Sequence, residues 1–425
     1  MTAAWDRRIA SIAIPATIAL ATEPLYDLVD TAILGHLGTT QLAGAALAMR
    51  VLGLGNSVFI FLMFGTTAAV AKRLGAGDER GATRAAVDAA WLAVALGSAA
   101  AVVLALCGRW AIGALGGHGA VATTAWIYLR TSLFGLPAFT LLMAGVGTLR
   151  GRGDARTPLR VAAASVTANL AIEVLLIYGL GYGVGASALG TVIAKWGAAA
   201  TTIALVAAWA RRHGASWRPT RRVRELAVVG RDLLVRTTLL IATLTAASAL
   251  AAHRGAVTLA AHSVVASVWM FSAYVNDGLE VAAQSLVAHE IGAGRSDGAV
   301  AVARRILWWS ARLGLSLAVV VAVTRSPLAA LFTDDPAVRA AAATPLWIVA
   351  AIQPLNSIAF ALDGILVGWE RVRVLATIMA VATAAFALTA GTAPSLLRIW
   401  LGIAAMMVVR AGAASWWFRR SARAA

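Results

Sequence analysis

Three acidic residues at helical spacing stand inside an apolar stretch near the start of the sequence. Glu23, Asp27 and Asp30 follow one another at intervals of four and three residues, so a helix places them on one face over about two turns. A charged side chain in mid-membrane costs about 2.5–3.5 kcal/mol and needs a function or a partner. Because neighbouring carboxyls repel, at least one is expected to hold a proton unless a cation lies among them. An alternative places Glu23 and Asp27 at the hydrated end of the span.

Two further polar pairs at the same spacing occur in later apolar stretches. Asn169 and Glu173 are four residues apart, as are Thr191 and Lys195. Amide and hydroxyl oxygens beside carboxylates suit a proton or a hard cation such as Na⁺. Lys195 is expected to pair with Glu173 or with an acid of the first helix, since an unpaired ammonium in a membrane is costly. A purely structural ion pair would have the same sequence pattern.

Two prolines lie in the stretch that carries the three acids. Pro15 and Pro24 each remove a backbone hydrogen bond and favour a bend. A bend beside the acidic residues would be a candidate moving part. Prolines are also common in membrane helices without such a role.

Long apolar helices must position these residues. The chain is 60% hydrophobic and only 13% charged, which is typical of a membrane protein rather than a soluble one. The sequence predicts an all-α integral membrane protein, because the apolar stretches are long enough to span a bilayer and do not alternate as strands would. Twelve spans are expected, at 9–34, 41–70, 85–108, 122–148, 158–180, 185–209, 226–251, 257–287, 300–324, 338–365, 373–391 and 396–417.

The net charge of +17 is distributed by topology rather than as a nucleic-acid-binding patch. Alternate gaps between the spans, together with both termini, hold 23 basic residues, against 5 in the other gaps. The positive-inside rule therefore places both termini in the cytoplasm, in agreement with an even number of spans. We expect a multi-pass protein of the bacterial plasma membrane, in contact with anionic lipid.

The sequence is internally duplicated. A shift of 217 residues aligns the second half with the first, with 15 identities over positions 36–86. The shift pairs His36 with His253, Gly38 with Gly255, and Pro137 with Pro354. A duplicated apolar chain is typical of a transporter built from two related bundles. We expect pseudo-symmetric six-helix lobes at 1–210 and 226–425, joined by a charged cytoplasmic linker at 211–225.

The two halves differ in their titratable residues. Asp30 corresponds to Ala247, so the coupling chemistry is expected in the N-terminal lobe. In the second half Asp277, Glu280 and Asp363 either line a cavity or form hydrogen bonds between helices. An enzyme is not expected, because the six histidines are scattered and the single cysteine, Cys107, forms no cluster.

Several motifs resemble one known family. The run from Glu23 to Gly38, EPLYDLVDTAILGHLG, is similar to the signature of the DinF-like branch of the multidrug and toxic compound extrusion (MATE) transporters. Residues 147–158, GTLRGRGDARTP, resemble the family motif LRGxGDxRTP, and the run from Asp363 to Ile365 is similar to a feature of the same branch. The resemblance covers nearly the whole chain.

The resemblance implies two six-helix lobes with a V-shaped opening and antiport of organic substrates against protons or sodium. It assigns ion coupling to Asp30, Asn169, Glu173 and Thr191, and bending on protonation to Pro15. The family usually has Asp where this chain has Glu173, and an uncharged residue is expected where Lys195 stands. A built-in cation could substitute for bound sodium, so these departures favour protons.

The sequence therefore predicts a monomeric, cofactor-free antiporter that exports amphiphilic organic compounds by alternating access. Aromatic residues suited to such substrates are Phe59, Phe61, Phe64, Trp269 and Phe271. An alternative with the same architecture is a flippase or transporter for lipid-linked or charged metabolites. Its basic cavity could be supplied by Arg50, Arg130, Arg236 and Arg410.

Overall fold

The protein is helical throughout its described part. A computed structural model describes residues 2–220, 223–391 and 395–424, and none of these residues is in a strand. Within these ranges the side chains of 2–3, 23–29, 31–32, 54–58, 223–227, 229 and 424 are not described.

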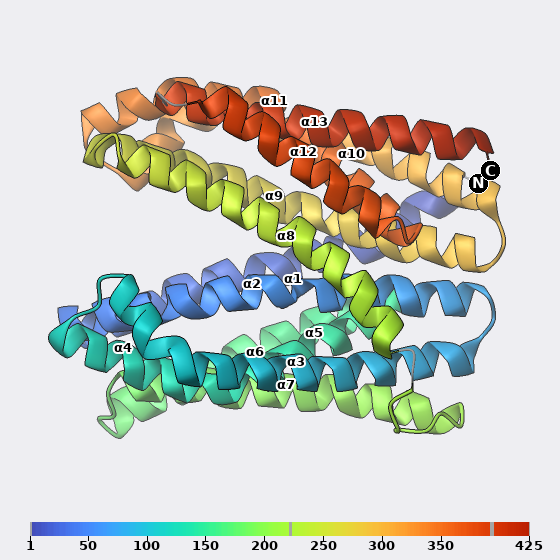
Figure 1. Cartoon of the computed structure of the whole chain (residues 1–425), viewed down its shortest axis with the longest axis horizontal. Coiled ribbons are helices and arrows are strands. Elements are labelled where there is room, and N and C mark those ends of the chain that lie inside the picture. The colour runs from blue at the N-terminus through green and yellow to red at the C-terminus, as the bar shows by residue number, and fades with distance from the viewer. Residues whose placement is uncertain (1, 221–222, 392–394, 425) are drawn as a thin grey trace. The chain divides into compact units, whose positions relative to one another are not determined.

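Helices follow one another with short connections (Figure 1). The first half contains α1 (Thr2–His36), α2 (Thr39–Gly75), α3 (Glu79–Ala114), α4 (Gly119–Ser132), the 3₁₀ turn η1 (Leu133–Gly135), α5 (Leu136–Gly151), α6 (Arg156–Val174), the π-helical turn η2 (Leu175–Gly179) and α7 (Val184–Arg212). The second half contains α8 (Val223–Ala252), α9 (Ala256–Gly292), α10 (Ser296–Phe332), α11 (Pro336–Gly368), α12 (Val372–Ala390) and α13 (Leu396–Ala424).

Ten helices of the described residues are long and apolar enough to cross a membrane. They correspond in order to the ten expected spans from the third onward, with α4, η1 and α5 forming one of them. The all-α membrane fold is thereby confirmed. The count of twelve is not, because the first two expected spans fall in α1 and α2, which contain side chains outside the described part.

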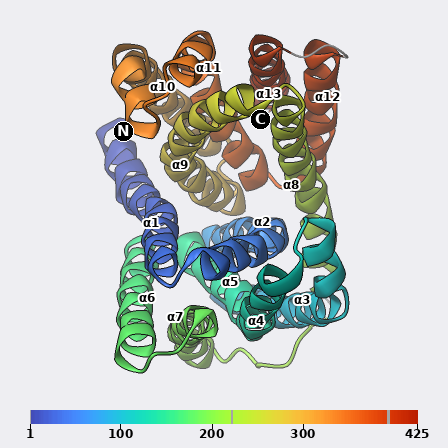
Figure 2. The same ribbon diagram turned by 90° about the vertical axis from the view of Figure 1, so that its left-hand side faces the viewer.

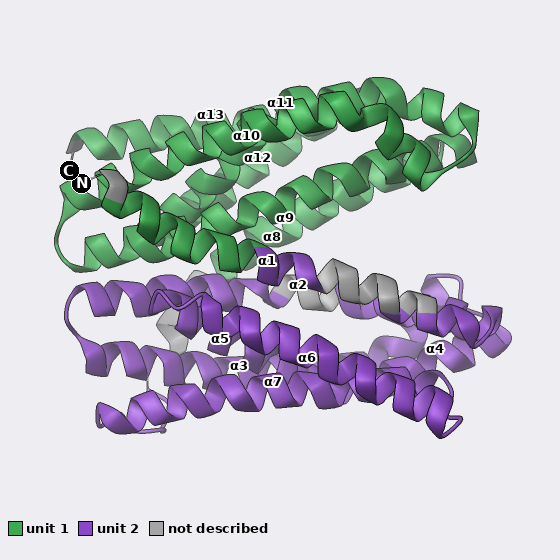
Figure 3. Cartoon of the chain, turned by 180° about the vertical axis from the view of Figure 1, so that it is seen from behind, with its two compact units in different colours: residues 1–17, 231–425 green, residues 18–230 purple. Residues whose placement is uncertain are grey.

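The chain folds into two compact units (Figure 3). Unit 1 comprises residues 1–17 and 231–425, and unit 2 comprises residues 18–230. The first turns of α1 thus belong with the second half of the chain, and the first turns of α8 with the first half. The lobe limits expected from the sequence differ in this respect and stay a prediction.

In unit 1, α11 lies beside α9, α10 and α13, and α12 packs on α13 (Figures 1 and 2). Its core is formed by Ala, Val, Leu and Met side chains with Trp269, Phe360 and Trp400. Small residues let these long helices approach closely, as is usual in membranes, where packing rather than water exclusion drives association.

In unit 2, α2 packs against α3, α4 and α5, and α7 packs against α5 and α6 (Figure 2). A core that includes Leu34, Tyr128 and Leu136 lies among α1, α2, α4 and the start of α5. A second hydrophobic cluster joins Val70 of α2 with Val206 and Trp209 of α7, near the C-terminal ends of these two helices.

The duplication is visible in the packing inside each unit. In unit 2, Gly97 of α3 lies so close to Pro137 that a methyl group would clash with it. In unit 1, Gly314 of α10 approaches Pro354 of α11 in the same way. Both pairs are related by the 217-residue shift found in the sequence. Since the contact recurs, each proline-containing helix is held by an equivalent glycine.

The first helix of each repeat, α1 or α8, has a hydrogen-bond contact at or just before its start. In the two repeats the partner residues, Arg305 and Asp88, occupy equivalent positions. Arg305 of α10 donates two hydrogen bonds of 2.6 Å to the Asp6 carboxylate of α1. Asp88 of α3 accepts hydrogen bonds from the backbone and hydroxyl of Thr220, just before α8, at 2.8 and 2.6 Å. Asp88 and Arg305 are 217 residues apart, so one position performs the same task with opposite charge. The Arg305–Asp6 contact ties the start of α1 to unit 1, and the Thr220–Asp88 contact lies within unit 2.

Candidate functional site

Asp30 is buried inside unit 2 and held by a serine. Its side chain has no exposed surface, and Oδ1 accepts a hydrogen bond of 2.8 Å from the Ser187 hydroxyl of α7. Ser187 is also fully buried. A carboxyl removed from water is stabilised by such a bond, and the serine fixes its orientation.

The hydrogen bonds continue from Ser187 to α6. The Thr191 hydroxyl donates to the backbone carbonyl of Ser187 at 3.2 Å, one helical turn away. The Asn169 amide in turn donates to the Thr191 hydroxyl oxygen at 3.2 Å. Residues of α1, α6 and α7 therefore form one polar cluster, and the sequence-predicted Asp30, Asn169 and Thr191 all belong to it.

Glu173 completes this cluster from α6. It is fully buried and interacts electrostatically with Asp30. Both Glu173 oxygens and Oδ2 of Asp30 are buried without a hydrogen-bond partner among the described residues. Two adjacent carboxyls in a low-dielectric interior cannot both be charged without a large penalty, so the pair requires a proton or a cation.

Local backbone features bring α6 and α7 together at this point. A Cβ atom on Gly190 would lie 3.0 Å from Oδ1 of Asn169 and 3.6 Å from the backbone nitrogen of Glu173. Glycine at this position lets α7 approach the site. Two residues after Glu173, α6 passes into the π-helical turn η2, a feature that occurs often at functional sites.

The sequence also predicted Lys195, Pro15, Glu23, Pro24 and Asp27 as site residues. The Lys195 ammonium lies over the Phe139 ring, 5.2 Å from its centroid, in a cation–π contact. Its expected pairing with an acid stays a prediction. Pro15 lies in unit 1 within the continuous helix α1, so it does not end the helix. The side chains of Glu23, Pro24 and Asp27 lie outside the described residues.

Sequence reasoning missed Ser187, which forms the direct hydrogen bond to Asp30. The available signal was its position one turn before Thr191, on the same face of the helix. Serine is too common in membrane helices for this spacing alone to identify a site.

A second buried polar centre lies in unit 1. Asp363 of α11 accepts hydrogen bonds from Arg236 of α8 and from Arg410 of α13, the latter at 2.6 Å. All three residues are at most 8% exposed. Glu280 of α9 lies near this cluster and accepts a hydrogen bond of 3.3 Å from Gln284. Of the two readings left open for Asp363, hydrogen bonding between helices is what the structure contains.

The aromatic residues expected to suit a substrate are divided between core and surface. Trp269 belongs to the hydrophobic core of unit 1, and Phe59 and Phe61 are also buried. Phe271 is 64% exposed.

Comparison with known proteins identifies the family. The sequence matches the model of the MatE family over residues 15–175 and 234–390, one segment in each repeat. It is 30% identical to Protein DETOXIFICATION 44, chloroplastic, of Arabidopsis thaliana over 96% of this chain and 81% of that protein. It is 28% identical to DNA damage-inducible protein F of Escherichia coli over 95% of this chain and 90% of the relative.

Solved structures share the same fold. A crystal structure of a Vibrio cholerae MATE transporter matches with a TM-score of 0.88 and 19% identity, covering all of this chain and 98% of the other. An outward-facing multidrug resistance MATE family transporter matches with a TM-score of 0.85 and 20% identity, over 98% and 96% of the two chains. With the family model matching most of its length, the chain belongs to the MatE family of multidrug and toxic compound transporters.

Proposed function

We propose that the Asp30–Glu173 pair couples the export of amphiphilic organic compounds to the inward movement of protons. The observation that carries this proposal is the set of three buried carboxyl oxygens without a hydrogen-bond partner in the described chain. A coupled transporter needs a group whose charge depends on ion occupancy, and two adjacent buried carboxyls are such a group.

The hydrogen bonds already formed by the polar groups next to Asp30 and Glu173 favour proton coupling over sodium coupling. The hydroxyls of Ser187 and Thr191 already donate within the cluster, and one Asn169 amide hydrogen is directed at Thr191. A sodium ion would need several of these oxygens turned toward it. A single proton shared by Asp30 and Glu173 requires no such rearrangement, because it neutralises one carboxyl and lets it donate to the other.

Coupling follows from competition between proton and substrate for one state of the transporter. Protonation from the outer side removes charge from the cluster and allows α1 to rearrange around Pro15, which lowers substrate affinity. The substrate leaves outward, the protein reopens inward, and the proton is released there. A differential affinity of a few kcal/mol between the two states is sufficient. Both termini are proposed to be cytoplasmic, and the protein is proposed to work as a monomer in the plasma membrane.

Ethidium transport into proteoliposomes tests the proposal, with a pH gradient and a sodium gradient imposed separately. We expect the wild type to respond to the pH gradient and Asp30→Asn to lose at least tenfold in rate, because asparagine cannot exchange a proton. Asp297→Asn, an exposed acid at the start of α10, is the matched control and should be unaffected. Transport driven by sodium alone would contradict proton coupling.

The alternative of a flippase or charged-metabolite transporter is tested by the same preparation. Arg236 and Arg410, two residues that could have supplied its basic cavity, both donate to Asp363, which compensates part of their charge. If the inserted wild type moves no dye under either gradient, the export proposal fails. Lipid-linked and anionic substrates would then be assayed in its place.

A further inference from the structure

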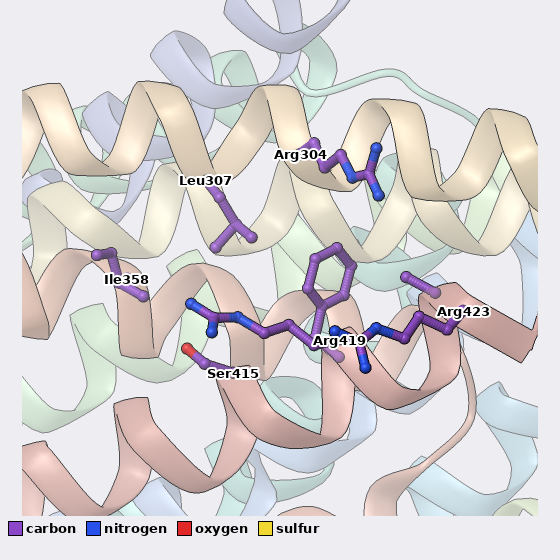
Figure 4. A pocket seen from close by; sticks show the side chains of 8 residues that line it. Arg304, Leu307, Ile358, Ser415, Arg419 and Arg423 are labelled. Atoms are coloured by element: carbon purple, nitrogen blue, oxygen red, sulfur yellow. The ribbon is translucent and has the colours of Figure 1, made fainter.

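Unit 1 has a pocket near the ends of α10 and α13 that takes no part in the coupling site. It is lined by Arg304 and Leu307 of α10, Ile358 of α11, and Ser415, Phe418, Arg419, Ala422 and Arg423 of α13. In Figure 4 Arg304 projects from α10 on one side of the opening, and Arg419 and Arg423 project from α13 on the other. Its volume of about 460 Å³ lies within the range of small-molecule sites, roughly 300–1,000 Å³.

The three arginines of this pocket lack internal counter-charges. No carboxylate in the described part of the chain forms an ion pair with Arg304, Arg419 or Arg423, and their side chains are exposed. Nearby arginines are engaged, since Arg305 binds Asp6 and Arg295 binds Glu290. Three unpaired guanidinium groups around one opening repel one another, so an anion between them would stabilise the arrangement.

The remaining lining is apolar. Phe418 is only 7% exposed, and Leu307 and Ile358 are partly buried between their helices. The Ser415 hydroxyl is the uncharged polar group of the lining. A ligand that matches this surface carries a phosphate and a hydroxylated headgroup on one side and hydrocarbon on the other.

Tryptophans mark the level of this pocket along the membrane normal. Trp308, next to Leu307, is 37% exposed, and Trp416, next to Ser415, is 60% exposed. Arg312 stacks on Trp308 at 3.5 Å, and Arg420 stacks on Trp416 at 5.6 Å. Exposed tryptophans with adjacent arginines gather where lipid headgroups meet water, so the pocket lies at headgroup depth.

The repeat shows that the fold does not create this pocket by itself. The position of Arg304 corresponds to Val87 in unit 2. Val87 is 1% exposed and packs with Ala210 and Ala215, so the same place is filled by a hydrophobic core. Unit 1 has arginine and an opening where unit 2 has valine and close packing.

We propose that this pocket binds one anionic phospholipid of the adjoining leaflet. The phosphate lies among Arg304, Arg419 and Arg423, where a guanidinium offers two parallel N–H donors to phosphate oxygens. Ser415 contacts the headgroup hydroxyls, and an acyl chain follows Leu307, Ile358 and Phe418. Basic pockets between membrane helices recognise such headgroups.

Native mass spectrometry of the purified protein, titrated with phosphatidylglycerol or phosphatidylcholine, tests the proposal. We expect the wild type to prefer phosphatidylglycerol. The triple variant R304Q/R419Q/R423Q should bind it at least tenfold more weakly, since each arginine near the headgroups contributes about fivefold. The matched control R211Q/R212Q/R218Q removes the same charge from exposed arginines of unit 2, outside the pocket, and should stay within twofold of the wild type.

Three outcomes would overturn the proposal. Equal loss of binding in both triple variants would mean that general surface charge attracts the lipid. Glycerol 3-phosphate, which has the phosphate but no acyl chain, should bind at least tenfold more weakly; equal affinity would mean a site for a free phosphorylated solute. No preference of the wild type for phosphatidylglycerol would mean no anionic-lipid site. The single variants R419Q and R423Q, expected to lose about fivefold each, cover the case in which the triple variant is not stably folded.

Discussion

The two units use one duplicated scaffold for two different buried polar centres. In unit 2, Asp30 and Glu173 lie together with one serine hydroxyl bonded to Asp30 and three carboxyl oxygens unpartnered among the described residues. In unit 1, Oδ2 of Asp363 accepts hydrogen bonds from both Arg236 and Arg410. The first centre places two acids side by side, whereas in the second the acid is bound by two arginines.

Neither polar centre is repeated at the equivalent position of the other half. The equivalent of Asp30 in the second repeat is Ala247, and the equivalent of Asp363 in the first is Val146. The shared glycine–proline contacts were retained in both units, while each polar centre exists in only one of them. Packing positions are constrained by the fold, but an ionisable group can be lost from one repeat when the other supplies it.

The largest difference between the two centres is expected in the stability of the variants Asp363→Asn and Asp30→Asn. Asp363→Asn removes the carboxylate to which two buried arginines donate, and breaking such a buried pair destabilises a protein by about 3–5 kcal/mol. Asp30→Asn keeps an acceptor for Ser187 and removes a buried charge, so its stability should stay within about 1 kcal/mol of the wild type. Thermal unfolding in detergent checks both. If Asp363→Asn is as stable as Asp30→Asn, the hydrogen bonds of Asp363 with the two arginines do not contribute to stability as proposed.

A smaller effect is expected at the close approach of α6 and α7. Gly190→Ala places a methyl group 3.0 Å from Oδ1 of Asn169, so the amide must shift away from Thr191. We expect the rate of proton-driven dye transport to fall severalfold with little loss of folded protein. Gly197→Ala, two turns along the same helix with nothing within 4 Å of the added atom, is the control. It should retain transport and gain up to about 1 kcal/mol of helix stability. Equal transport rates in the two variants would mean that the close contact at Gly190 does not affect coupling.

The repeats also differ at one strained backbone position. Glu370 has a φ of 58°, whereas its equivalent in unit 2 is Gly153 with a φ of 77°. A left-handed conformation costs a non-glycine residue about 1–2 kcal/mol. Glu370→Gly is therefore expected to stabilise the protein by about 1 kcal/mol, and Gly153→Ala to destabilise it by a similar amount. Thermal midpoints of the two variants check this, and shifts of the same sign in both would contradict it.

The smallest effect concerns the ion pair that holds the start of α1. Hydrogen bonds from Arg305 and Trp309 lower the pKa of Asp6 from 3.8 to about 2. Because the folded-state pKa is the lower one, the pair stabilises the protein above about pH 4 and stops doing so as the pH falls through about 2. The thermal midpoints of wild type and Asp6→Asn should differ by a constant amount above pH 4 and converge toward pH 2. A difference that persists unchanged at pH 2 would assign the effect to something other than the Asp6 charge.

Much of the fold could be predicted from the sequence. Ten expected spans coincide with helices to within eight residues at either end, because apolar length and the residues between spans are local properties of the chain. The duplication predicted equivalent packing, and the recurring contacts of Gly97 with Pro137 and Gly314 with Pro354 agree with it. Asp30, Asn169, Glu173 and Thr191 could be singled out because polar residues at one-turn spacing are rare in apolar helices.

Which of these residues meet, and how their charges are balanced, depends on contacts between helices that are distant in the sequence. Helical spacing places Asn169 beside Glu173, but it cannot bring Ser187 to Asp30, which lies 157 positions away. The same applies to Asp363, whose partners come from α8 and α13, and to the three arginines around the pocket of unit 1. Spacing along a helix fixes neighbours within one turn, whereas contacts between helices depend on rotation and close approach, which are set by packing of the whole unit.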